Sequence, residues 1–451
     1  MPSKPSFLAG ILSAIFERGR TPARRAAVAG PPIDLPALCA RLVAGEGEAS
    51  CVAMATEILA RWSALDEAGQ LDFLLALAHG FGPDPIRLGR AIAAYQARPD
   101  AETVMAVHYA AEPPRQEVLR RLNLAPFGTL TLVRMRETAL KRLPDHPALK
   151  VLDADFVHLF SSWFNRGFLV LQRIDWASPA NILEKIIRYE AVHEIRDWND
   201  LRRRLQPGDR RCFAFFHPAL VDEPLIFVEV ALAGEIPSSI GGLLAPGGEA
   251  AAGARPTTAV FYSISNCQAG LRGISFGDFL IKQVVDELRR ELPELATFVT
   301  LSPVPGFAAW LARQLEGGEG DSLLAPEDRE ALAGLSDDAG EAEALRPRLL
   351  RAAATYFLQA KTVAGKPLDP VARFHLNNGA SLHRLNPMAD GSPRALREAH
   401  GLMVNYQYKL DEIEANHERF TREGHVAASE PVRRLASADP PPGARRARRA
   451  R

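Results

Sequence analysis

The chain has little that points to a metal, a membrane or nucleic acid. Its four cysteines, among 451 residues, form no C-x-x-C pair and no Cys/His ligand spacing, which favours reduced thiols in a cytosol. No apolar run reaches the length of a helix that spans a bilayer. The 54 basic and 54 acidic side chains cancel, so the net charge indicates no nucleic-acid partner. We therefore expect a cytoplasmic protein that binds no metal, membrane or nucleic acid.

Both ends of the chain are poor in the patterns that predict a packed core. Residues 1–32 hold five basic side chains and only one acid, Glu17. A eukaryotic transit peptide would look similar, but no cleavage signal is clear, and the Ala/Arg/Gly/Pro-rich style suggests a bacterial source. We predict a flexible N-terminus over residues 1–34. The Pro- and Arg-rich end predicts a disordered basic tail over residues 421–451.

The length of 451 residues is too great for one ordinary core and favours two domains. Apolar residues recur at helical spacing from Leu35 to about Leu169, without strand-like alternation. This pattern predicts a helical bundle domain over residues 35–172. The segment shows no catalytic pattern, so we expect it to mediate homo-oligomerisation.

The second half predicts an α+β domain with a mixed sheet over residues 173–420. After a helix at 180–195, strands are expected to begin beyond Gly208. Two of them, 211–216 and 224–232, form a hairpin. The polar, acidic segment 316–343 is expected to be an exposed insertion.

The stretch from Thr257 to Trp310 reads as strand, glycine loop, helix and strand. The strands are 257–265 and 297–301, the helix is 276–292, and prolines stop the second strand. A loop that opens a helix suits an anion, because the first helical amides have no internal partner. The loop resembles the Arg/Gln-x-x-Gly-x-Gly/Ala loop with which GNAT-superfamily acyltransferases hold the coenzyme A pyrophosphate, although Ser275 replaces the first glycine. The CoA-binding residues that this resemblance implies are Arg272, Gly273, Ile274, Ser275, Phe276 and Gly277.

Several ordered segments together resemble the malonyl-CoA decarboxylase family from about Met135 to about Leu410. They are Leu159–Asn165, Ile187–His193, Phe261–Ser265, Gly277–Lys282, Leu301–Phe307, Phe374–Ala380 and Gly401–Tyr408. The resemblance implies a GNAT-like catalytic domain behind a helical oligomerisation domain. It also implies a homo-oligomer, suspected to be a tetramer.

The same resemblance assigns catalytic roles to Ser302, His375 and Tyr408. Taken locally, a serine between a strand and a proline is usually a turn former, and a histidine before Asn377-Asn378 is usually structural. A tyrosine in an aromatic segment is usually part of a core. The asparagines themselves are expected to act in a turn.

Decarboxylation of a malonyl thioester makes chemical demands that these residue types meet. A hydroxyl such as that of Ser302 can orient the carboxylate, and an imidazole such as that of His375 can protonate the enolate. The thioester carbonyl is itself an electron sink, so we expect no cofactor beyond the coenzyme A of the substrate.

Three other functions compete. A covalent Ser-His-Asp hydrolase would have a Gly-x-Ser-x-Gly turn, which the Leu-Ser302-Pro-Val sequence lacks. The glycine loop alone would also suit an N-acetyltransferase. A non-catalytic acyl-CoA-binding scaffold built on the helical domain is the third.

Overall fold

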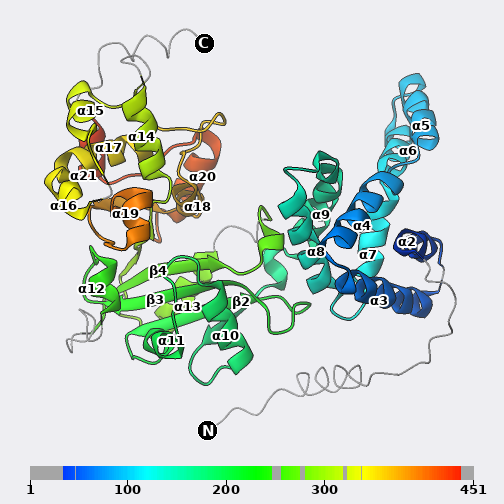
Figure 1. The fold of residues 1–451 in the computed structure, drawn as a ribbon, viewed down its shortest axis with the longest axis horizontal. Helices are drawn as coiled ribbons and strands as arrows, with labels where there is room; N and C mark the ends of the chain where they lie inside the picture. The colour runs from blue at the N-terminus through cyan, green and yellow to red at the C-terminus, as the bar shows by residue number, and fades with distance from the viewer. Residues whose placement is uncertain are drawn as a thin grey trace.

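The computed structural model describes residues 34–45, 47–245, 255–274, 280–317, 322–336 and 338–437. It divides into a helical region and a sheet region covered by further helices (Figure 1). This confirms the expected fold class of a helical part followed by a mixed-sheet part. The N-terminal prediction for residues 1–33 and the last part of the predicted tail, 438–451, lie outside the described residues.

The helical region is built from helices that, apart from α5 (Pro85–Ala97), each bury residues in the single chain. Its helices are α2 (Leu35–Ala44), α3 (Glu48–Ala64), α4 (Glu67–Gly80), α5 (Pro85–Ala97), α6 (Ala101–Ala111), α7 (Pro114–Leu122), α8 (Gly128–Arg142) and α9 (Lys150–Trp163). The predicted continuous helical pattern is confirmed. Among the described residues, no helix is both long enough and apolar enough to cross a bilayer.

One mixed sheet forms the second region. Its strands are β1 (Val170–Ile174), β2 (Arg210–Phe216), β3 (Pro224–Ala233), β4 (Thr258–Asn266), β5 (Thr297–Thr300), β6 (Ser302–Pro303), β7 (Ser381–Asn386) and β8 (Met403–Gln407). The spatial order is β1-β2-β3-β4-β5-β8-β6, and β7 also pairs with β8. The hairpin of β2 and β3 is confirmed. Only the β4–β5 pair is parallel among the described pairings; α13 (Leu280–Glu291) connects these two strands.

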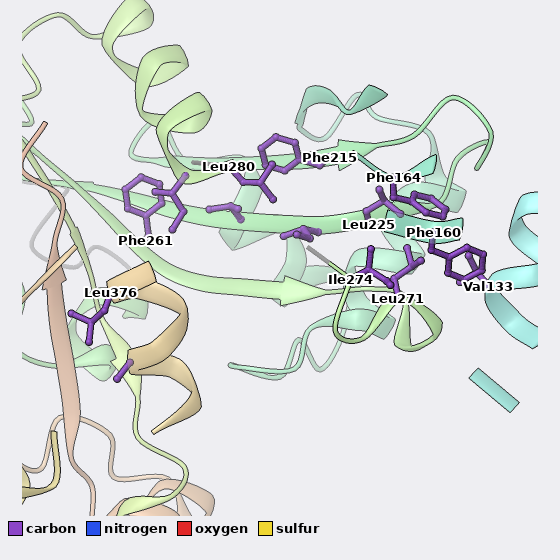
Figure 2. Packing of buried hydrophobic residues seen from close by; sticks show 14 of the residues in the cluster. Val133, Phe160, Phe164, Phe215, Leu225, Phe261, Leu271, Ile274, Leu280 and Leu376 are labelled. Carbon is purple, nitrogen blue, oxygen red and sulfur yellow. The ribbon is translucent and has the colours of Figure 1, made fainter. Parts of the chain in front are cut away.

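Helices cover both faces of the sheet and its far end. They are α10 (Ala180–Tyr189), α11 (Trp198–Leu205), α12 (Ile240–Leu244), α14 (Phe307–Glu316), α15 (Pro326–Leu332), α16 (Ala339–Ala344), α17 (Arg346–Leu358), α18 (Pro370–Asn377), α19 (Pro393–Ala399), α20 (Ile413–Glu423) and α21 (Glu430–Ser437). The main apolar cluster runs without a break from the helical region through the sheet to α18. Figure 2 shows Val133 and Phe160 beside Leu271 at one end, and Phe261 and Leu376 at the other. All four cysteines are buried and free, as expected.

Several sequence predictions need correction. Strands begin earlier than expected, because β1 pairs with β2. The helix predicted to reach Ile195 ends at Tyr189. The prolines after β5 do not stop the sheet at once, because Ser302 and Pro303 pair with Val404 and Met403 of β8.

Two segments expected to be exposed or disordered contain packed helices, although most described residues of 316–343 are exposed as predicted. The segment 316–343 contains α15, where Asp328 is buried between Arg348 and Arg351. Residues 421–437 include the end of α20 and all of α21, which packs on α17 and β7. The start of the disordered tail was therefore predicted too early in the sequence, because residues 421–437 are folded.

Candidate active site

Helix α18 places His375 in its last turn. Asp369 starts the helix by accepting a hydrogen bond from the backbone N–H of Ala372, at 2.7 Å. The helix stops after Asn377, because Gly379 has φ of +81° and a Cβ there would lie 2.3 Å from the Ile413 carbonyl oxygen. The tight turn therefore fixes where the helix ends and keeps His375 directed into the protein.

Short pairing with β8 places Ser302. Because Thr300 and Ser302 are two residues apart in extended backbone, their side chains lie on the same side. The Ser302 hydroxyl is 2.9 Å from Thr300 Oγ1, which also accepts the backbone N–H of Tyr406 at 3.1 Å. Ser302 is thus fixed by contacts from two strands.

The structure brings the three residues assigned catalytic roles into one hydrogen-bonded chain. Ser302 Oγ lies 3.1 Å from His375 Nε2, although the two residues are 73 positions apart. On the other side of the ring, Nδ1 of His375 lies 2.8 Å from the Tyr408 hydroxyl. Both imidazole nitrogens therefore have a partner, and the ring is held in one plane.

The proton can occupy either nitrogen of His375 in this chain. If Tyr408 donates to Nδ1, the Nε2–H donates to Ser302 Oγ. If Nδ1–H donates to Tyr408, the Ser302 hydroxyl donates to Nε2 and gives up the bond that it donates to Thr300 Oγ1. The chain can thus present either a hydroxyl or an imidazole N–H to a bound group, which suits proton transfer.

Burial keeps the chain uncharged. Ser302 is 5% exposed, while His375 and Tyr408 are each 3% exposed. Desolvation lowers the pKa of His375 to about 3 and raises the pKa of Tyr408 well above its usual value. Both side chains are therefore neutral near pH 7. No ionised side chain contributes to the pKa of His375.

Aromatic rings complete the surroundings of His375. Tyr406 stacks on the imidazole with ring centroids 4.6 Å apart and planes inclined by 24°. Phe374 meets the same ring edge-on at 5.1 Å. These contacts restrict the ring to one orientation and exclude water from its faces.

Sequence reasoning missed Thr300 and Tyr406. Each lies two residues from a predicted site residue, Ser302 or Tyr408, and residues two apart in a strand share a face. The alternation was visible in the sequence, but the strand before Ser302 was expected to end at Leu301. Asn378 behaves as expected: its Nδ2 donates to the Phe374 carbonyl at 2.8 Å and supports the turn.

The predicted CoA loop is described only in its first half. Arg272 and Gly273 are exposed, and Ile274 is buried, whereas Ser275, Phe276 and Gly277 lie outside the described residues. The structure therefore does not place the amides proposed to meet the pyrophosphate.

Helix α8 holds the entrance to this loop. Arg136 Nη1 donates to the carbonyl oxygens of Gly270 and Arg272 at 2.8 and 2.9 Å. The same guanidinium is fixed by Asp153 at 2.8 Å. The backbones meet so closely that a Cβ on Gly270 would lie 1.9 Å from the Val133 carbonyl oxygen. The helical region thus fixes the start of the loop in the sheet region.

Two of the segments that carry the family resemblance, Ile187–His193 and Phe261–Ser265, are joined by hydrogen bonds. Glu190 accepts hydrogen bonds from Ser263 at 2.9 and 2.7 Å, and from the backbone N–H groups of Val192 and His193. These bonds tie the end of α10 to β4. They explain Glu190 and Ser263 of these segments without a direct role in chemistry.

Two family models match the chain from residue 81 onward. Residues 81–164 match the malonyl-CoA decarboxylase N-terminal domain, and residues 167–445 match the malonyl-CoA decarboxylase C-terminal domain. The mitochondrial malonyl-CoA decarboxylase of Mus musculus is 35% identical over 413 residues, which cover 83% of this chain and 84% of that protein.

Solved structures agree with these matches. The crystal structure of malonyl-CoA decarboxylase from Rhodopseudomonas palustris is 57% identical, with a TM-score of 0.82 over 89% of this chain and 98% of that chain. The Agrobacterium vitis enzyme is 56% identical, with a TM-score of 0.83 over 89% and 99% of the two chains. With both halves matched in sequence and the whole architecture shared, the chain belongs to the malonyl-CoA decarboxylase family.

Proposed function

We propose that this protein decarboxylates malonyl-CoA to acetyl-CoA and CO2. The observation that carries the proposal is the buried chain of Ser302, His375 and Tyr408, in a member of this family. A hydroxyl and an imidazole nitrogen 3.1 Å apart can both reach one small acyl group. No further cofactor is part of the proposal, because the thioester accepts the electron pair.

Ser302 orients the substrate. Its hydroxyl donates a hydrogen bond to the malonyl carboxylate and holds that group out of the plane of the thioester. In this orientation the breaking C–C bond overlaps the carbonyl π system, so its electron pair can enter the thioester as an enolate. Without substrate the same hydroxyl donates to Thr300 Oγ1, and the malonyl carboxylate takes the place of this acceptor.

His375 supplies the proton. In the empty site its pKa is about 3, so the imidazole is neutral. A malonyl carboxylate placed beside it adds a negative charge in a dry environment, which raises the pKa of the ring. The imidazolium then protonates the α-carbon after CO2 has left, and becomes neutral again. One proton is consumed for each CO2 released, and Tyr408 holds the ring throughout.

The loop from Arg272 to Gly277 is our candidate for the CoA pyrophosphate. Its support is the Arg/Gln-x-x-Gly-like sequence and the position before α13, whose first amides favour an anion. The hydrogen bonds from Arg136 to the loop entrance would keep this site rigid.

We also propose a cytoplasmic homo-oligomer, with a tetramer suspected from the family resemblance. The helical hairpin of α5 and α6 projects from the rest of its region (Figure 1). Helix α5 buries no residue in the single chain. The hairpin exposes the apolar side chains Ile86, Ile92, Tyr95, Val104, Met105 and Tyr109. Such a surface favours association. The free cysteines suit a reducing compartment.

Release of CO2 from malonyl-CoA by the purified protein tests the function. We expect turnover in the wild type and a large loss in Ser302→Ala. Mass spectrometry of the wild type should find no acyl group on Ser302. An acylated Ser302 would favour a covalent hydrolase. CoA binding without CO2 release would favour a scaffold, and acetyl transfer to an amine instead would favour an N-acetyltransferase.

A further inference from the structure

A polar hollow lies on the outer side of β7 and β8. Its volume is about 480 Å³, and its walls come from β7, β8, α20, α21 and the segments between them. This size lies in the range of small-molecule sites, roughly 300–1,000 Å³. The basic side chains on its wall are His383, Lys409, Arg419, His425 and Arg433.

The positive charge of the hollow is only partly neutralised. Glu412 pairs with Lys409 at 3.1 Å, and Glu430 pairs with Arg434. Among the described residues, the side chain of Arg419 has no ion pair or hydrogen bond. Arg433 donates to the Ala428 carbonyl, which holds its guanidinium without cancelling its charge. The two arginines are therefore left to bind an anion.

The rest of the wall is polar. Gln407 and Asn416 contribute side-chain amides, whereas the hydroxyls of Ser381 and Ser429 already donate to the carbonyls of Gln407 and His383. A phosphate group presents several oxygen acceptors and suits arginines beside such amides.

The hollow and the Ser302–His375–Tyr408 chain share a strand and a turn. At the end of β8 and in the two residues after it, Gln407 and Lys409 line the hollow, and they alternate with Tyr406 and Tyr408. Tyr408 is hydrogen bonded to His375 on the other side. A ligand that moved this strand would therefore move a partner of the imidazole.

Helix α20 makes a second connection, since it packs beside α18 (Figure 1). Asn416, which lines the hollow, donates to the Gly379 carbonyl at 3.3 Å. The next residue, His417, is hydrogen bonded to the Asn377 carbonyl. Both contacts hold the turn at the end of the helix that carries His375.

We propose that this hollow is a second anion site, which binds a phosphate-bearing small molecule and couples it to the position of His375. The site is separate from the proposed CoA loop, because its residues come from β7, β8, α20 and α21. Anion binding in this hollow is a function separate from decarboxylation. The binding part of the proposal holds whether or not the protein decarboxylates malonyl-CoA.

Calorimetry with inorganic pyrophosphate tests binding. The full chain is first saturated with CoA, so that any pyrophosphate site for CoA is filled. Arg419→Glu is compared with Arg422→Glu, which makes the same charge change three residues along α20. Arg422 is exposed and pairs only loosely with Glu418 at 3.9 Å. Thermal unfolding of both variants checks that each is folded.

We expect Arg419→Glu to weaken pyrophosphate binding at least about 10-fold, the effect of losing and reversing one charged partner. Arg422→Glu should change it less than about twofold. Wild-type-like binding in Arg419→Glu, an equal loss in both variants, or no binding by the wild type would overturn the site.

The coupling is measured on CO2 release at saturating malonyl-CoA. Pyrophosphate should change kcat of the wild type and leave that of Arg419→Glu unchanged. A wild-type kcat unaffected by bound pyrophosphate would overturn the coupling. If the protein does not decarboxylate malonyl-CoA at all, the proposed function fails while the calorimetric result still decides the anion site.

Discussion

Replacing Tyr408 by Phe removes one hydroxyl and leaves the ring. The hydroxyl lies 2.8 Å from Nδ1 of His375, and both side chains are 3% exposed. Water therefore cannot easily replace the lost partner. A buried polar group left without its hydrogen bond costs about 1–3 kcal/mol.

The same loss should appear in the reaction. In our mechanism the charged imidazole donates its Nδ1–H to the Tyr408 hydroxyl, and this hydrogen bond stabilises the charge and holds the plane of the ring. Each ~1.4 kcal/mol lost from the transition state lowers the rate about tenfold. We therefore expect kcat to fall about 10- to 100-fold, while KM for malonyl-CoA stays within about twofold.

The assay is CO2 release over a range of malonyl-CoA concentrations. Tyr406→Phe is the control, because it removes a hydroxyl two residues away and leaves both partners of the His375 nitrogens in place. Equal kcat values for Tyr408→Phe and wild type would refute the reasoning. Equal losses in both tyrosine variants would show that packing, and not this hydrogen bond, is responsible.

Three further predictions concern the imidazole and the loop entrance. His375→Asn should keep CoA affinity and lower kcat by about 10²–10⁴-fold, and near-normal turnover would remove His375 from the mechanism. Burial lowers the pKa of His375 from 6.5 to about 3. As the pH falls below 6.5, the unfolded chain therefore takes up a proton at this residue that the folded chain does not. Folding stability should therefore fall with decreasing pH by up to about 1.4 kcal/mol per unit, and urea unfolding at pH 7, 6 and 5 should show a shallower loss in His375→Gln. Gly270→Ala should destabilise the protein by about 1–3 kcal/mol or more and raise KM, because its Cβ would meet the Val133 carbonyl at 1.9 Å. An unchanged KM in a stable variant would argue against this role of α8.

The sequence was sufficient where one local pattern decides the structure. The strands β2, β3 and β4 are mostly apolar or β-branched and almost entirely buried, so composition alone identified them. The helical half was equally visible from its spacing. The strand β1 was missed because its side chains are mostly exposed, which leaves no apolar run to recognise.

The candidate site needed a different kind of information. Ser302, His375 and Tyr408 were named through a family resemblance, and their contacts depend on pairing across about 100 residues. Nothing local to His375 predicts that its ring stacks on Tyr406. Likewise, Asp328 can be buried because Arg348 and Arg351 of a later helix pair with it. Local composition does not show this pairing, so the acidic segment was predicted to be exposed.

Because β8 is synthesised after the strands that it joins, the sheet stays incomplete during much of the synthesis of the chain on the ribosome. This strand is the last one in sequence, yet it lies between β5, β6 and β7 in the sheet. Until Met403–Gln407 emerges, β5 has β4 on one side and an open edge on the other. An open edge can pair with another chain, so shielding at this stage would protect the protein from aggregation. Since Tyr408 follows β8 directly, a chain that stops before it could keep most of the sheet and still lack the partner of His375 Nδ1.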